Sequence, residues 1–312
     1  FRRNIVCLLS VLGVLSCTAS LYYVERMTFL KPIFIFTLFL RFFQGAFYGL
    51  AQMVLSSTLI IDTSESFQRT EANHSSSWFS RFSLSLGPVL SLVVFQYSGF
   101  NWALLASIIC GLVAILLIMM VKFPFKTHEG DTKVLSSDRF FLTQGKWLFA
   151  NLTITTSVIG LLLSTRLSFP FYGMVMGGFI LALLAQKFVF AQAELESEVI
   201  SGIILIGVAI LMMLTRHQTI VFYLSPLLIG LGIGIIGSRF LLFFIKLSHH
   251  SQRGTSQSTF LLGWESGIGI GLFIGYALMY DQPQWIYITS IILLLISFLI
   301  YHFFTHKWFM KH

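Results

Sequence analysis

Long apolar stretches alternate with short polar ones along the whole chain. Because a helix rises ~1.5 Å per residue and a bilayer core is ~30 Å thick, about 20 consecutive apolar residues predict a membrane-spanning helix. Ten stretches come close to this length, so the pattern predicts an all-α polytopic membrane protein. The expected spans cover residues 4–24, 32–61, 73–97, 101–122, 147–165, 169–188, 199–215, 219–246, 255–280 and 285–304.

Two of these stretches depart from the common pattern. The stretch 32–61 has about 30 residues, so its helix must tilt or project beyond the lipid. The stretch 147–165 carries polar side chains at Asn151, Thr153, Thr155, Thr156 and Ser157. Polar groups need partners in lipid, so this helix should face a bundle interior or a wet cavity.

The longest polar segment divides the chain into unequal parts. Residues 123–146 predict a solvated linker between four spans in 1–122 and six spans in 147–312. Two equal halves would need six spans each, and the chain begins at Phe1 rather than at Met. We therefore expect a fragment that two further helices precede.

A weak internal repeat supports two related halves. Residues 69–91 and 253–275 share a pattern at an offset of 184 positions. The matched pairs are Arg69 with Arg253, Ser83 with Gly267, Gly87 with Gly271, and Ser91 with Gly275. With Gly263, the later copy has a small residue at every fourth position, a stripe that lets another helix approach closely in lipid.

Basic residues set the expected orientation. If the N-terminus is cytoplasmic, the cytoplasmic segments hold thirteen Lys and Arg residues and the outer segments hold four. This bias follows the positive-inside rule, and an even number of spans then places both termini in the cytoplasm.

Composition excludes several classes of protein. The chain is 56% hydrophobic and 10% charged, with a mean hydropathy of +0.85, which no soluble domain of this length could bury. The net charge of +8 is scattered, so nucleic acid is not an expected partner. Cys7, Cys17 and Cys110 lie in apolar runs as isolated thiols, and we expect no metal and no cofactor. No glycine loop that would cradle a nucleotide phosphate and no catalytic set of side chains is present, so neither ATP-driven action nor an enzyme is expected.

Three short motifs resemble those of the major facilitator superfamily. Residues 41–45 read Arg-Phe-Phe-Gln-Gly and Gly49 follows, which resembles the signature of the family's fourth helix. Residues 83–88 read Ser-Leu-Ser-Leu-Gly-Pro, similar to the motif of the fifth helix, although Ser83 replaces a glycine. Arg2 and Arg3 resemble the end of the loop motif between helices two and three. In this register the chain covers helices three to twelve.

The resemblance implies a monomeric secondary transporter of the inner membrane. It would move a small solute across the lipid bilayer by alternating access, with a mid-membrane site between two pseudo-symmetric halves. It also implies a proton gradient as the driving force and a role for Arg41 in proton coupling and substrate contact, with Gln44 one turn away. Asp62 would pair with Arg2 or Arg3 as a gate. Gating or packing roles are expected for Arg2, Arg3, Asp62, Gly45, Gly49, Gly87, Pro88, Gly263, Gly267, Gly271 and Gly275.

Charged residues inside the spans are the candidate transport pathway. An Arg at this depth costs ~2.5–3.5 kcal/mol on insertion scales, so Arg41 should face a cavity or a partner, or else bond backbone carbonyls structurally. Arg81 either serves the pathway or extends along its apolar stem to the membrane interface. Arg239 and Glu265 lie in adjacent spans at similar depth and could form an ion pair, either fixed or breaking during transport with Glu265 as a proton acceptor. Asn151 completes the expected pathway.

Three functional alternatives remain open. The excess of Arg over acid in the spans favours an anionic solute, whereas the aromatic residues around Arg41 favour efflux of drug-like compounds. A non-transporting sensor or an intramembrane enzyme is the alternative of another class, but a sensor would need a soluble domain.

Overall fold

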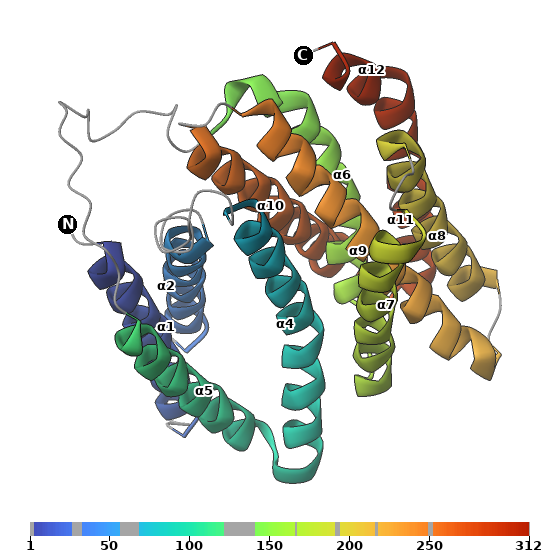
Figure 1. Ribbon diagram of the computed structural model, residues 1–312. Coiled ribbons are helices and arrows are strands. Elements are labelled where there is room, and N and C mark those ends of the chain that lie inside the picture. Colours follow the sequence, from blue (N-terminus) through green and yellow to red (C-terminus); the bar gives the residue numbers. More distant parts are fainter. Residues whose placement is uncertain are drawn as a thin grey trace, which may run out of the picture. The chain divides into compact units, whose positions relative to one another are not determined.

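The computed structural model describes residues 3–26, 33–56, 69–121, 141–165, 167–190, 194–215, 218–248 and 252–311. Within these ranges, ten helices are long and apolar enough to cross a membrane. The expected all-α polytopic architecture is confirmed (Figure 1). The gate expected from Arg2, Arg3 and Asp62 falls outside the residues and side chains that are described.

The first helices follow the expected spans closely. They are α1 (Arg3–Arg26), α2 (Ile33–Val54), α4 (Arg69–Ser98) and α5 (Phe100–Met120). Only Gly99 separates α4 from α5, and its φ of +88° lies in the left-handed region that glycine adopts without steric cost. The stretch expected at 32–61 is helical as far as Val54, and residues 57–61 lie outside the described part of the chain.

The later helices include one boundary that matters for the site. They are η3 (Thr143–Gly145), α6 (Lys146–Leu163), α7 (Phe169–Phe188), α8 (Leu195–Thr215), α9 (Thr219–Leu247), α10 (Arg253–Leu278), α11 (Pro283–Ile300), the π-helical turn η5 (Tyr301–Thr305) and α12 (His306–Phe309). The seventh expected span was placed at residues 199–215, but α8 begins four residues earlier, at Leu195, which brings Glu198 into the helix. The helices α4 and α10 begin at Arg69 and Arg253, the two arginines matched by the internal repeat.

The chain divides into two compact units. The first contains residues 1–76 and 90–134, in which α1 packs against α2 and α5. The second contains residues 77–89, the middle of α4, together with 135–312. In the second unit α6 packs against α10 and α11, while α9 packs against α7 and α8.

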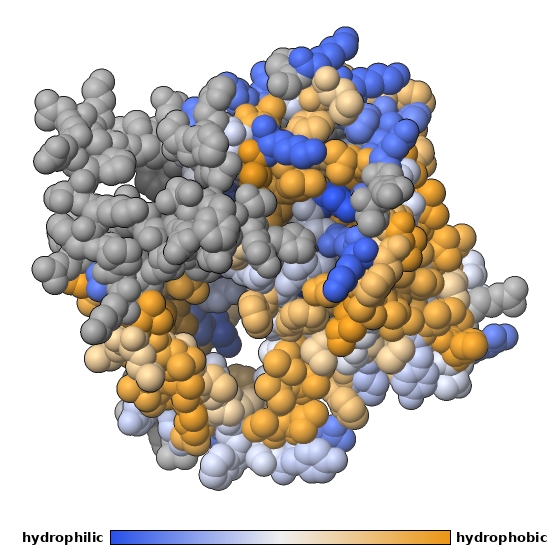
Figure 2. All heavy atoms as spheres, viewed as in Figure 1, coloured by the Kyte–Doolittle hydropathy of each residue, from blue (hydrophilic) through white to orange (hydrophobic). Residues whose placement is uncertain are grey.

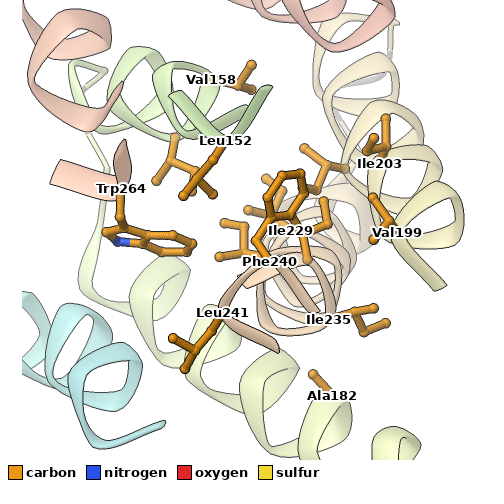
Figure 3. Packing of buried hydrophobic residues seen from close by; sticks show 14 of the residues in the cluster. Leu152, Val158, Ala182, Val199, Ile203, Ile229, Ile235, Phe240, Leu241 and Trp264 are labelled. Carbon is orange, nitrogen blue, oxygen red and sulfur yellow. The ribbon is translucent and has the colours of Figure 1, made fainter. Parts of the chain in front are cut away.

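The core of the second unit is apolar and continuous. Figure 3 shows side chains from several helices meeting there, with Phe240 and Ile229 of α9 near the centre. Leu152 of α6 and Trp264 of α10 point toward one another in the same view. On the outside, Figure 2 shows hydrophobic residues over α5 in one unit and over α8 in the other, as expected for surfaces that face lipid.

The polar helix α6 lies inside this unit, as its sequence predicted. Asn151 and Thr156 are 0% exposed, and Thr155 is 2% exposed. Each of these side chains has a hydrogen-bond partner on α6 itself, α10 or α11. The expectation that its amide and hydroxyl groups would face a bundle interior is therefore confirmed.

Candidate functional site

Arg81 lies at the middle of α4 and is almost completely enclosed. Its exposed fraction is 3%, and its Cζ lies 4.7 Å from the centre of the Trp78 ring. Gly237 of α9 lies beside the guanidinium, since a Cβ added there would lie 2.9 Å from Arg81 Nη2 and also 2.9 Å from Cζ3 of Trp264 on α10. All of these residues belong to the second unit. This burial argues against the alternative in which Arg81 extends to an exposed interface.

The guanidinium of Arg81 has no acceptor among the described residues. Both terminal nitrogens, Nη1 and Nη2, are buried without a hydrogen-bond partner. None of the ion pairs between described residues includes Arg81. A buried charge without a hydrogen-bond or ion-pair partner is costly, and the pathway role expected for Arg81 stays a prediction.

Arg239 has a different partner from the one expected. Its Nε donates to Glu198 Oε2 at 2.5 Å, where the sequence suggested a pair with Glu265. The side chain of Glu198 is 1% exposed, and its second oxygen Oε1 has no partner among the described residues. The pairing was missed because Glu198 was placed before the span, whereas the first turn of α8 carries it against α9.

Glu265 lies on an exposed part of the α10 surface, away from the close-packed glycine stripe. It takes part in an interaction of its own. Its role as a proton acceptor stays a prediction.

In the first unit, Arg41 is the start of a short polar chain. Arg41 Nη1 donates to Gln44 Oε1 at 3.0 Å, and Gln44 Nε2 donates to Thr18 Oγ1 on α1 at 3.0 Å. The sequence placed Arg41 and Gln44 near each other, but it gave no sign of Thr18. The arrangement connects α2 to α1 and leaves Arg41 itself exposed.

Asn151 is hydrogen-bonded within the helix bundle, and its expected place on the transport pathway stays a prediction. Its Nδ2 donates to the carbonyl oxygen of Ser297 on α11 at 2.9 Å. The hydroxyl of Ser297 bonds Thr155 at 2.7 Å and lies 3.4 Å from Asn151 Oδ1. These bonds hold α6 to α11, which is how the low hydrophobicity of α6 is accommodated in lipid.

Four glycines of α10 at every fourth position lie against α6 and the residue that follows it. A Cβ at Gly267 would overlap Thr156, one at Gly271 would overlap the backbone of Ser157, and one at Gly275 would overlap Ser164. Gly263 is less tight, with an added Cβ 3.1 Å from Phe149 Cδ2. The stripe therefore allows the backbones of α6 and α10 to approach closely.

The motif residues on α2 and α4 behave differently. An added Cβ at Gly45, Gly49 or Gly87 would have no described atom within 4 Å. Pro88 lies inside α4 and cannot donate the backbone hydrogen bond of an ordinary helical residue. The packing or gating role expected for these residues stays a prediction.

Comparisons with known proteins now bear on this arrangement. No family model matches the sequence, and no curated protein matches it. Solved structures do match. The Escherichia coli fucose:proton symporter is 12% identical, with 97% of this chain and 84% of that chain covered, at a TM-score of 0.61. In another structure that symporter is described as a major facilitator superfamily transporter. The chain has the major facilitator fold.

Two further structures with this fold are similar. The human organic anion transporter has 15% identity and a TM-score of 0.63, covering 96% of this chain and 76% of that chain. A bacterial homolog of the human lysosomal transporter Spinster has 11% identity and a TM-score of 0.60, covering 100% of this chain and 84% of that chain. The major facilitator architecture was expected from the sequence motifs and is confirmed.

Proposed function

We propose that the protein is a secondary carrier that moves a small solute across a membrane by alternating access. The observation that carries this proposal is a major facilitator fold whose apolar helices enclose the unpaired guanidinium of Arg81. The similar structures named above are those of transporters and not of enzymes, which supports a carrier. The distribution of basic residues favours both termini in the cytoplasm. The resemblance to the major facilitator superfamily favours an inner membrane and a monomer.

Proton coupling is part of the proposal. The described helices enclose Glu198, whose second oxygen is unsatisfied, and α10 carries Glu265 within its span. A carboxylate in a low-dielectric span can hold a proton in one conformation and release it in another. The fucose carrier with a similar fold is a proton symporter, which supports the idea by analogy.

An anionic solute is favoured by the charges that remain. Glu198 neutralises Arg239, whereas Arg81 has no carboxylate partner and Arg41 is bonded to a neutral amide. With Glu265 counted as well, three arginines stand against two carboxylates, so these groups together keep one net positive charge. The similar human structure is that of an organic anion transporter, which agrees with this sign.

The experiment is uptake into proteoliposomes that contain the purified protein. Labelled organic acids, sugars and peptides are supplied with and without an inward proton gradient, and with a protonophore. We expect saturable uptake of at least one organic acid that the protonophore abolishes. Uptake of sugars or peptides alone would contradict the anionic solute, and uptake that ignores the gradient would contradict proton coupling.

A second candidate, efflux of drug-like compounds, rests on the aromatic residues beside Arg41. Phe42 is 70% exposed, and its ring centre lies 5.6 Å from that of Phe43. Extrusion of a hydrophobic cation from loaded proteoliposomes, without any organic-acid flux, would favour this function over the first.

A further inference from the structure

Three polar side chains lie on one buried face at the middle of α4. Ser77, Arg81 and Ser85 are four residues apart, so they lie one above another over about 12 Å of helix. Their exposed fractions are 7%, 3% and 1%. The hydroxyl oxygens of both serines have no hydrogen-bond partner, and neither do the two terminal nitrogens of Arg81. Four unsatisfied polar atoms therefore follow one another along a single helix face.

Ser225, Ser256 and Ser290 also have buried hydroxyls without a partner, so the charged guanidinium of Arg81 is the group here that a molecule from outside the chain would complete. Most serines in a helix bond the carbonyl one turn earlier, as Ser10 and Ser238 do here, but Ser77 and Ser85 do not. A guanidinium has only donors, and a hydroxyl can donate as well as accept. The common complement of these three side chains is a group that is rich in acceptors and negatively charged.

The surroundings of Arg81 restrict the shape of that group. The ring of Trp78 covers the guanidinium at 4.7 Å, so a ligand must approach from the edge. Approach along the edge presents two parallel N–H groups, which match the two oxygens of a carboxylate. On the α9 side, a Cβ added at Gly237 would lie 2.9 Å from Arg81 Nη2 and 3.0 Å from Nε, so the backbone of α9 closes that side of the guanidinium.

We propose that Arg81 holds the carboxylate of a small organic acid, and that Ser77 and Ser85, one turn to either side on the same buried face, lie beside the rest of the solute. One guanidinium provides one positive charge, which balances a monocarboxylate and leaves a phosphate dianion half compensated. The inference rests on the proposed carrier function and names the part of the solute that α4 recognises. An acidic lipid headgroup offers related oxyanion chemistry, and the experiment separates the two sources.

The test is binding of 4-fluorobenzoate to the full chain in neutral detergent. Binding is measured as broadening of the ¹⁹F NMR line of the ligand. The control ligand is 4-fluorobenzamide, which has nearly the same shape and no charge. We expect concentration-dependent broadening of the acid and none of the amide. Equal broadening of both ligands would overturn the proposal, because the charge would then contribute nothing.

Four variants locate the binding. Arg81→Gln should weaken the binding at least tenfold. Arg81→Lys should weaken the binding less, because lysine keeps the positive charge but lacks the two parallel N–H donors of a guanidinium. Gly237→Ala displaces the Arg81 head without changing any charge, so it should also weaken binding. Its matched control is Gly269→Ala, at a helical glycine whose added Cβ would meet nothing within 4 Å, and it should bind as the native chain does. Native affinity in both Arg81→Gln and Gly237→Ala would overturn the assignment.

Two additional measurements remove ambiguity. Gly237→Ala takes the place of Arg81→Gln if that variant does not fold, and native affinity in Gly237→Ala alone would then count against the subsite. In lipid nanodiscs, phosphatidylglycerol that displaces the acid while phosphatidylcholine does not would assign the site to a lipid and overturn the proposal. Binding without any proteoliposome uptake would uphold the subsite and reject the carrier, whereas uptake of an acid without Arg81-dependent binding would do the reverse.

Discussion

Gly271 of α10 lies directly against Gly160 of α6. A Cβ added to either residue would lie 2.9 Å from the Cα of the other, so the two helices meet through their backbones. Thr153 and Thr156 of α6 donate to the Gly263 carbonyl oxygen of α10 at 3.4 and 3.3 Å, which adds weak polar contacts to the same interface. The later copy of the sequence repeat, in α10, therefore forms one side of a close contact between α6 and α10.

This contact predicts that Gly271→Ala destabilises the protein. The added methyl group would overlap the Ser157 carbonyl, a backbone atom that cannot rotate away, and overpacking of this kind costs about 1–3 kcal/mol. Thermal unfolding in detergent, followed by circular dichroism, should show a clearly lower midpoint. The matched variant Gly269→Ala should keep the native midpoint or raise it, because alanine has the better helix propensity. Equal midpoints for the two variants would show that the α6–α10 contact is looser than described.

The pair formed by Arg239 and Glu198 should behave as a buried ion pair. Removing one partner leaves an uncompensated charge and typically costs about 3–5 kcal/mol, whereas replacing both by apolar residues costs much less. Arg239 is 18% exposed, so the lower end of that range is expected. Unfolding of Glu198→Leu, Arg239→Met and the double variant forms a double-mutant cycle. Additive losses in the double variant would show that the two side chains are not coupled.

Asn151 should matter for stability and not for recognition of the solute. Asn151→Leu removes the hydrogen bond to the Ser297 carbonyl, which still accepts from the Tyr301 backbone N–H, so the loss costs about 0.5–1.5 kcal/mol. The midpoint of unfolding should fall while the apparent KM for uptake remains native. A changed KM with an unchanged midpoint would return Asn151 to the pathway that its sequence first suggested.

Glu265 provides the test of proton coupling. If its carboxylate takes up the coupled proton, Glu265→Gln keeps the shape of the side chain but can no longer titrate, so uptake should lose its dependence on pH while insertion and folding stay native. Uptake by the native protein and by the variant is compared between pH 5.5 and pH 8. Unchanged pH dependence would remove Glu265 from the coupling step and leave Glu198 as the carboxylate to examine.

The sequence predicted the architecture well because hydrophobic length is a strong physical signal. Ten apolar stretches became ten helices, and the arginines matched by the repeat begin α4 and α10. The polar α6 was correctly expected to face inward, since lipid leaves no other place for Asn151 and its neighbours.

The partners of the charged residues were harder to predict. Pairing depends on helix rotation and on the exact start of each helix, and the four residues by which α8 begins early were enough to hide Glu198. An acid at the edge of a span, one turn from an apolar run, was the signal that could have revealed it. The unpaired state of Arg81 depends on packing among α4, α9 and α10, about which spacing along the chain carries no information.

Solute counterflow tests the central claim most directly. Proteoliposomes are loaded with a high concentration of an unlabelled organic acid and diluted into a trace of the labelled acid, with no proton gradient and no membrane potential. A carrier that alternates between two faces exchanges one molecule for another, so we predict a transient accumulation of label inside that exceeds its outside concentration. Label that only equilibrates, or that does not enter at all, would contradict alternating access by this protein.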